Sequence, residues 1–144
     1  INDRYGHAAG DTALRHYAHV VQNAVRASDR FGRLGGEEFV LLMYDCDPAQ
    51  ALIHAQRVCD ALRDTPLYLQ GCEVPMTTSG GLASYQAGDS ADVILARADV
   101  ALYRAKEQGR DRVEMAFSGR GVGRVHVTGQ AANAPLAVQE ASGD

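Results

Sequence analysis

The sequence lacks the features of several protein classes. No apolar stretch in its 144 residues approaches the roughly 20 residues that a membrane span needs. Its three cysteines, Cys46, Cys59 and Cys72, form no CxxC pair, which predicts neither a disulfide framework nor a zinc site and favours a reducing, cytoplasmic setting. The net charge of -4 argues against a general binder of nucleic acid or anionic membranes.

Enough apolar material is present for one domain. Apolar residues make up 46% of the chain, and its length suits one domain better than two. Their spacing predicts helices over residues 11–27, 47–65 and 90–109, and strands over residues 30–34, 37–44, 72–85 and 111–117. This alternation, with one hairpin in it, indicates an α+β or α/β sandwich in which helices flank a mixed central sheet.

The last part of the sequence differs in composition from the rest. Residues 117–144 are rich in Gly, Ala, Ser and Gln and have little apolar period, so we expect a flexible tail after a domain of residues 1–116. The chain also opens at Ile1 in what resembles the middle of a domain. We therefore expect a piece of a longer protein, with one more strand ahead of Ile1.

Two histidines lie three positions apart on the first predicted helix. His16 and His19 could in principle hold a metal ion. Because no third ligand lies nearby in the sequence, we interpret them as ordinary residues of the helix surface.

The stretch Gly35-Gly36-Glu37-Glu38 combines a tight turn with two adjacent acids. Glycine lets another molecule approach the backbone closely. Neighbouring carboxylates repel each other unless a divalent cation lies between them or one of them is protonated, and Mg²⁺ prefers a few carboxylates plus substrate phosphates. The turn therefore indicates either a metal-and-phosphate site or an exposed, polar hairpin tip.

Three cationic residues are candidates for the phosphate side of such a site. Lys106 and Arg110 lie four positions apart near the end of the last predicted helix and should share a face, although a lysine there also suits the helix dipole without any ligand. Arg33, just before the glycines, could stabilise charge that develops on a phosphate in the transition state.

Two polar residues near the N-terminus could recognise a purine. Asn2 and Asp11 offer an amide and a carboxylate. A carboxylate accepts from the N1–H and N2–H₂ donors of guanine, and an amide both donates and accepts. Taken alone, Asp11 would equally suit the N-cap of the first helix.

Together these segments resemble the GGDEF family of diguanylate cyclases. The signature hairpin is here Gly35-Gly36-Glu37-Glu38-Phe39, the GGEEF form, INDRYGHAAGD is similar to the guanine-binding segment, and ADVALYRAKEQGRDRV is similar to the C-terminal helix segment. The three motifs occur in the family's order and spacing. The resemblance implies a nucleotidyl-cyclase-like fold with a ferredoxin-like core.

The resemblance also implies a reaction and a set of roles. Two protomers would meet face to face and condense two GTP molecules into cyclic di-GMP, releasing pyrophosphate. Glu37 and Glu38 would hold Mg²⁺ or Mn²⁺, Glu37 would also deprotonate the attacking 3′-hydroxyl, and Arg33 would assist at the transition state. The substrate-binding residues would be Asn2, Asp11, Gly35, Gly36, Lys106 and Arg110. The implied partners are GTP, cyclic di-GMP and a second copy of the chain, without nucleic acid or membrane contact by this segment.

A further match concerns regulation. Family members that are inhibited by their product carry RxxD five residues before the signature, and this sequence has Arg26 and Asp29 in those positions. Arg57 lies where another arginine of that site is expected. Two arginines and an aspartate suit a dinucleotide with two phosphates and two guanines. The simpler interpretation is an ion pair at a helix end, which contributes little.

The sequence departs from the family pattern in two places. The family's first strand, with a metal-binding aspartate and a carbonyl ligand, would precede Ile1, so we expect an incomplete sheet, weak folding and little activity from this chain alone. Gly81 stands where a branched apolar residue is usual, and there we expect only a local packing cost.

Two other functions remain in view. A GGDEF-type domain without turnover could bind GTP or cyclic di-GMP as a sensor. A ferredoxin-like nucleic-acid binder is disfavoured by the acidic balance and by the lack of exposed aromatic residues on the predicted strands. The sequence also leaves open whether an upstream region anchors the longer protein in the inner membrane.

Overall fold

The computed structural model describes residues 7–116 and 123–130. Its helices are α2 (His7–Ala24), α3 (Pro48–Arg63) and α4 (Ala91–Glu107). Its strands are β1 (Arg30–Gly35), β2 (Glu38–Cys46), β3 (Leu67–Leu69), β4 (Cys72–Val74), β5 (Ser79–Ser84), β6 (Val113–Met115) and β7 (Gly123–Gln130). Within this part of the chain, no helix combines the length and the apolar character that crossing a membrane requires.

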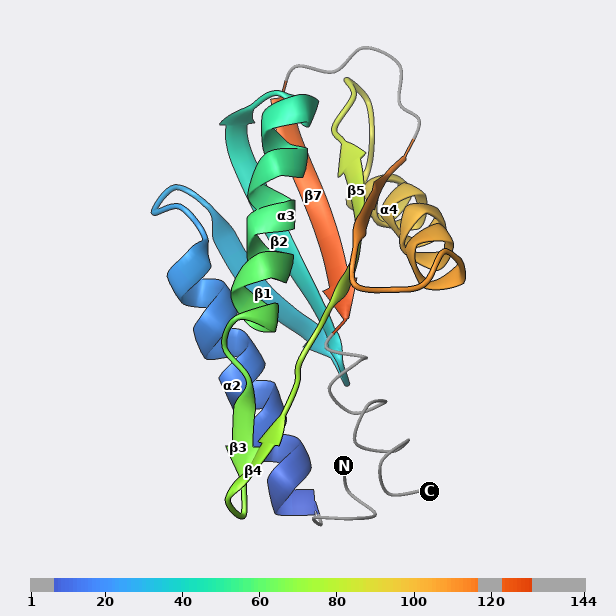
Figure 1. Cartoon of the computed structure of the whole chain (residues 1–144). Coiled ribbons are helices and arrows are strands. Elements are labelled where there is room, and N and C mark those ends of the chain that lie inside the picture. Colours follow the sequence, from blue (N-terminus) through green and yellow to red (C-terminus); the bar gives the residue numbers. More distant parts are fainter. Residues whose placement is uncertain (1–6, 117–122, 131–144) are drawn as a thin grey trace.

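A five-stranded sheet forms the centre of the molecule, in the order β1-β2-β7-β5-β6. All neighbours in it run antiparallel except β5 and β6, which are parallel. The sheet is therefore mixed, as the sequence predicts. A separate two-stranded ribbon of β3 and β4 lies beside α2 (Figure 1).

Helices cover both faces of this sheet (Figure 1). On one face α2 and α3 bury Tyr17, Val21 and Leu62 against strand residues such as Met43. On the other face α4 buries small residues and Ile94 against β5. All six residues of β5 are buried, as expected for a strand with helices on both sides. The predicted sandwich of helices around a mixed sheet is confirmed.

One expectation is corrected at the C-terminal end. Gly123–Gln130 do not form a flexible tail, because they make β7, which pairs with β2 on one side and β5 on the other. The segment contains Val125, Val127 and Thr128, and β-branched residues of this kind favour strands. The interior place in the sheet that was expected to lack a strand is thus filled by β7. Residues 117–122 and 131–144 lie outside the described part of the chain.

The region between α3 and α4 also differs from the prediction. The single strand expected over residues 72–85 is two strands, β4 and β5, with Pro75 between them, and β3 was not foreseen. A two-residue turn joins β3 to β4, since Gln70 and Gly71 both have positive φ, at 51° and 78°. The left-handed conformation is ordinary for Gly71, whereas for Gln70 it was not predicted.

Helix boundaries follow the capping signals at three of the predicted ends. The Asp47 carboxylate accepts from the Gln50 N–H to start α3, and the Ser90 hydroxyl accepts from the Val93 N–H to start α4. Gly109, just past α4, has a φ of 113°, which is typical of a glycine that ends a helix. Asp11 is not an N-cap, because α2 already begins at His7.

Gly81 carries more structural consequence than the sequence suggested. A Cβ atom there would lie 1.9 Å from the carbonyl oxygen of Ala98 and 2.5 Å from the backbone nitrogen of Leu102. Both atoms belong to the backbone of α4, so no side-chain movement relieves the overlap. The expectation that glycine at this position costs packing energy is therefore wrong. The absence of a side chain at Gly81 is what lets α4 lie directly on β5.

Candidate functional site

The hairpin between β1 and β2 places its two glycines in conformations that favour glycine. Their φ values are 153° for Gly35 and 52° for Gly36, and a Cβ on either would meet nothing within 4 Å. The register slips by one residue between Arg33 and Gly35, which is a β-bulge. Arg33 Nε donates to the Gly36 carbonyl oxygen at 2.9 Å. The turn is thus open to solvent on its backbone and held by an arginine.

The two acids follow the glycines directly. Glu37 is half-buried and Glu38, the first residue of β2, is exposed. Burial raises the pKa of Glu37 above its ordinary value of 4.5, and the charge of Lys106 opposes this rise. A carboxylate that is partly removed from water in this way is a good position for a cation.

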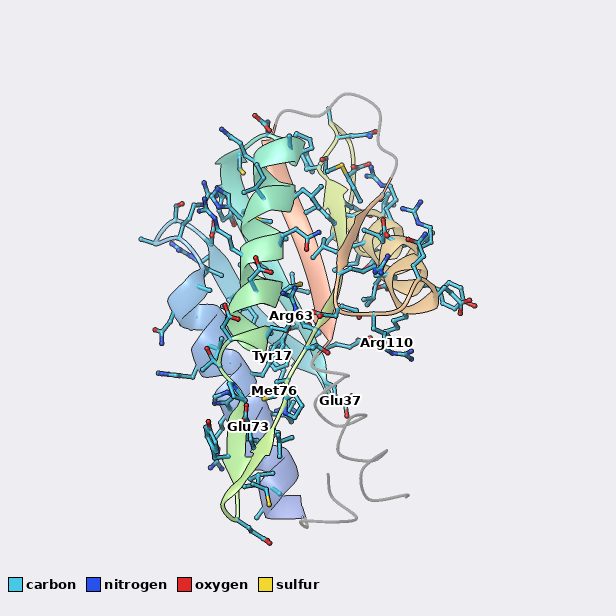
Figure 2. All side chains as sticks on the ribbon, in the orientation of Figure 1. Tyr17, Glu37, Arg63, Glu73, Met76 and Arg110 are labelled. Carbon is cyan, nitrogen blue, oxygen red and sulfur yellow. The ribbon has the colours of Figure 1, made fainter. Side chains whose placement is uncertain are left out.

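The end of α4 brings positive charge to the same turn. Burial and the neighbouring charge of Arg110 lower the pKa of Lys106, whereas Glu38, Glu37 and Asp99 raise it. Lys106 therefore lies within electrostatic reach of both acids of the hairpin. Figure 2 shows Glu37 at the hairpin tip and Arg110 just past α4, at the same end of the molecule.

The prediction that Lys106 and Arg110 share a helical face needs a correction. α4 ends at Glu107, and Arg110 lies beyond it with a φ of 63°. A left-handed residue turns the chain away from the helix axis, so Arg110 reaches the site from the loop and not from the helix.

A groove of about 500 Å³ lies beside the hairpin. It is lined by Asp11, Leu14, Arg15, Ala18, Phe31, Gly32, Arg33 and Phe39. The structure thus brings together Asp11 from α2 and Arg33 from β1, two residues that the sequence analysis singled out separately. A lining that combines charged side chains with aromatic rings suits a flat, polar ring system such as a nucleobase.

Sequence reasoning missed two residues of this region. Arg15 lines the groove, and its position four residues after Asp11 was an available signal, because such residues share a helical face. Asp99 lies seven residues before Lys106 on α4, which also places it on the same side. Burial raises the pKa of Asp99, with a further rise from the charge of Glu38 and a fall from that of Lys106.

The candidate regulatory residues lie away from the turn. Arg26 donates to both carboxylate oxygens of Asp29, with an Nη2–Oδ1 distance of 2.8 Å, and also to the Tyr44 carbonyl oxygen. The Asp29 side chain is 1% exposed and that of Arg26 is 32% exposed. Arg57 is exposed on α3. The structure thus joins Arg26 to Asp29, whereas the role of Arg57 stays a prediction.

The two histidines of the first helix make hydrogen bonds within the fold, and one candidate for purine recognition falls outside the described residues. His16 Nε2 makes a 2.7 Å hydrogen bond with the Thr65 carbonyl oxygen, and His19 bonds to Asn23. These bonds are compatible with the interpretation of both histidines as ordinary residues of the helix surface. Over residues 7–116 and 123–130, no cluster of three or more His, Cys, Asp or Glu side chains stands ready for a metal ion. Asn2 lies outside the described part.

The largest pKa changes belong to the core. Burial raises the pKa of Cys59 to about 12, and it also raises the pKa of Tyr17 well above its ordinary value. Tyr17 Oη lies 3.1 Å from Thr78 Oγ1. These groups are neutral and packed between α2, α3 and the sheet, so they do not compete with the hairpin as a reactive site.

Comparisons with known proteins agree on one family. The family profile described as "Diguanylate cyclase, GGDEF domain" matches residues 1–112. Diguanylate cyclase A of Treponema denticola is 37% identical over 116 residues, which cover 80% of this chain and 31% of that protein. Diguanylate cyclase DgcP of Pseudomonas aeruginosa is 38% identical over 120 residues, covering 81% of this chain and 17% of that protein.

Solved structures show the same likeness. The GGDEF domain of DgcB from Caulobacter crescentus, in complex with c-di-GMP, gives a TM-score of 0.76 at 29% identity and covers 81% of this chain and 70% of that one. The active GGEEF domain of a diguanylate cyclase from Vibrio cholerae gives 0.70 at 31% identity, covering 83% and 75%. The chain spans a third or less of the curated relatives described above. With a family profile that matches most of its length, the chain belongs to the GGDEF domain family of diguanylate cyclases.

Proposed function

We propose that the chain forms the GTP site of a diguanylate cyclase, which condenses two GTP molecules into cyclic di-GMP and pyrophosphate. The observation that supports this most is the convergence of Glu37, Glu38 and Arg110 on Lys106 at one end of the sheet. Acids that suit a divalent cation and cations that suit phosphates thus lie within electrostatic reach of each other, which a metal-bound triphosphate needs.

The donor chemistry of the turn fits Mg²⁺ or Mn²⁺. Glu37 and Glu38 would hold the ion, and the burial that raises the pKa of Glu37 is a cost that a cation beside it would offset. When bound, the ion would neutralise charge on the phosphate oxygens. Lys106 and Arg110 would hold the β- and γ-phosphates.

The groove would hold the base. The Asp11 carboxylate, on the groove wall, would accept from the N1–H and N2–H₂ donors of guanine. Asn2 is proposed to complete this recognition. Gly35 and Gly36 leave the backbone open, so that the nucleotide could lie against the turn between the groove and the end of α4.

The reaction needs a base and charge stabilisation. Glu37 would take the proton of one GTP's 3′-hydroxyl. The freed oxygen bonds to the α-phosphorus of the second GTP, the bond from that phosphorus to the β-phosphate oxygen breaks, and pyrophosphate leaves. Arg33, held at the turn by its bond to Gly36, would stabilise the developing charge. A second protomer would carry the other GTP. The same attack would then occur a second time, from the 3′-hydroxyl of the second GTP on the α-phosphorus of the first.

The direct test is product formation. A longer chain, with the strand that the family resemblance places ahead of Ile1 restored, would be incubated with GTP and Mg²⁺ and assayed for cyclic di-GMP, with Glu37→Ala as the matched variant. The proposal predicts cyclic di-GMP from the parent and at least a hundredfold less from the variant, on the order of the effect of removing a catalytic proton acceptor. Binding of GTP without any turnover would instead support the sensor function.

Product inhibition is a separate part of the proposal. Arg26 and Asp29, with Arg57, would bind cyclic di-GMP. A related GGDEF domain has been solved in complex with c-di-GMP, which supports binding of this dinucleotide by the fold but does not assign the residues. Since Arg26 also bonds to the Tyr44 carbonyl oxygen, its loss could disturb the fold, and Arg57→Ala is the cleaner variant.

The measurement is the inhibition constant for cyclic di-GMP. We expect Arg57→Ala to raise it at least tenfold while the initial rate is kept, because a charge-assisted contact to phosphate is lost. An unchanged inhibition constant in both Arg57→Ala and Arg26→Ala would remove these residues from the account.

A further inference from the structure

The loop after α4 has an unusual backbone. Three consecutive residues have positive φ: Gly109 at 113°, Arg110 at 63° and Asp111 at 49°. Glycine adopts such angles without cost, whereas arginine is strained there and aspartate is strained to a lesser degree. Strain of this kind persists only where surrounding contacts hold it in place, and it is frequent at ligand-binding sites.

An ion pair from another helix holds this loop. Arg63, the last residue of α3, donates from Nε to Asp111 Oδ2 at 2.7 Å. Its guanidinium also lies 3.0 Å from Asp60 Oδ1. In the described part of the chain, Asp111 Oδ1 is buried and accepts no hydrogen bond. Asp111 thus directs its charge at Arg63, across 48 positions of sequence.

Backbone bonds extend this arrangement to the sheet. The Arg110 N–H donates to the Ala105 carbonyl oxygen at 2.9 Å, which closes the end of α4, and the Gly80 N–H donates to the Arg112 carbonyl oxygen at 2.9 Å. Arg112 Nε donates to the Arg110 carbonyl oxygen. The backbone of Arg110 is therefore held through both its N–H and its carbonyl oxygen. Arg110 directly precedes Asp111 and follows Lys106 by four positions.

Stability alone is a weak reason for this ion pair. The side chains of Arg63 and Asp111 are 44% and 30% exposed, and ion pairs with this much solvent contribute little to folding. The strain of two left-handed residues acts against folding as well. An arrangement that stabilises little but fixes the direction of a cation suits a positioning role.

We propose that the Arg63–Asp111 ion pair positions Arg110, so that its guanidinium meets the terminal phosphates of the bound nucleotide. Arg63 and Asp111 are positioning residues that do not touch the ligand themselves. This inference rests on the proposed function, because it takes Arg110 to be a phosphate-binding residue. It adds that α3, which carries no part of the proposed GTP site, controls affinity for the triphosphate.

The test compares ligands that differ only in phosphates. GTP and GMP would be titrated, with Mg²⁺, into the parent chain and into Arg63→Gln, Asp111→Asn and Asp111→Gly. Glycine at position 111 keeps the left-handed backbone and asparagine tolerates it, so these variants remove the ion pair without imposing new strain. Asp60→Asn is the control, because it breaks the other contact of Arg63 and leaves Asp111 in place.

We expect about a tenfold weaker affinity for GTP in all three ion-pair variants, since one charge-assisted contact is lost. Affinity for GMP and the behaviour of Asp60→Asn should stay within twofold of the parent. In an Arg110→Ala background, Arg63→Gln should have no further effect on GTP affinity, because the residue it positions is gone.

Other outcomes would overturn the inference. Equal weakening of GTP and GMP, or a full additional loss in the Arg110→Ala background, would mean that the pair only supports the fold. Unchanged GTP affinity in the variants would mean that it positions nothing. If the parent chain bound no GTP, the proposed function would fail first and the inference with it, and that result is distinct from a parent that binds while the variants bind equally.

Discussion

Glu37 lies on a turn where part of its hydration is lost and where a lysine faces it. Burial raises the pKa of its carboxyl group above 4.5, so the folded chain binds this proton more tightly than the unfolded chain does. Stability contributed by the protonated group is therefore lost as pH rises from 4.5 through the raised pKa. A residue that disfavours folding at neutral pH is expected where ligand binding, and not stability, determines its identity.

Glu37→Gln should consequently be the more stable chain above this window. Glutamine has no charge to desolvate, so the melting temperature of the variant should exceed that of the parent at pH 7. The difference should vanish below about pH 4.5. Thermal unfolding at several pH values measures this. Added Mg²⁺ and GTP should raise the melting temperature of the parent but not of the variant. A variant less stable than the parent at pH 7 would contradict this account of the turn.

At the scale of elements, the sequence predicted what its local signals encode. The caps at Asp47 and Ser90 and the glycine after α4 placed the ends of helices, and the continuous apolar run after Glu38 predicted β2. Two features escaped. Glutamine and arginine give no sequence sign of the left-handed backbone that Gln70 and Arg110 adopt beside glycines. The short β-branched alternation of β7 lies in a Gly-rich segment, and its place between β2 and β5 is decided by pairing across the sheet.

The candidate site divides in the same way. The acids of the hairpin and the cations of the last segment are readable because their residue types and spacing carry the chemistry. Arg15 and Asp99 required the helix geometry that places them beside candidate site residues. The contact between Arg63 and Asp111 joins distant parts of the chain, and a single sequence contains no signal for such a pair.

The contact of α4 with β5 depends on Gly81. Alanine there would force apart two backbones that leave only 1.9 Å for its Cβ, so we expect Gly81→Ala to reduce the free energy of unfolding by about 2–4 kcal/mol. Urea unfolding measures this. Gly32→Ala is the control, because a Cβ at Gly32 meets nothing within 4 Å. Equal stabilities of the two variants would show that α4 does not lie this close to the strand.

β7 offers a second test at this scale. Val127 pairs with Leu41 on β2 and Leu82 on β5, and proline at an interior strand position removes a ladder hydrogen bond. Val127→Pro should therefore reduce the free energy of unfolding by about 3 kcal/mol or abolish the cooperative transition. Val127→Thr keeps the N–H and the preference for strands, so its loss reflects the side chain alone and should be smaller than that of the proline variant. A proline variant as stable as the parent would remove β7 from the sheet.

In the molecule as a whole, the sheet brings two sequence-distant segments to one end. The hairpin of β1 and β2 supplies acids, and the end of α4 with the loop after it supplies cations. The groove beside the hairpin is lined by α2 together with β1 and β2. None of these segments forms a nucleotide site alone. The arrangement explains why a chain with a net charge of -4 could hold a highly anionic ligand: the charge that matters is local.

The central claim is that the turn at Glu37 and Glu38 and the end of α4 form one site for metal-bound GTP. A crystal structure of the chain with Mg²⁺ and a non-hydrolysable GTP analogue tests this most directly. The account predicts the triphosphate between the turn and Lys106 with Arg110, and the base in the groove beside Asp11. An analogue bound elsewhere on the molecule, with the turn and the groove empty, would contradict it.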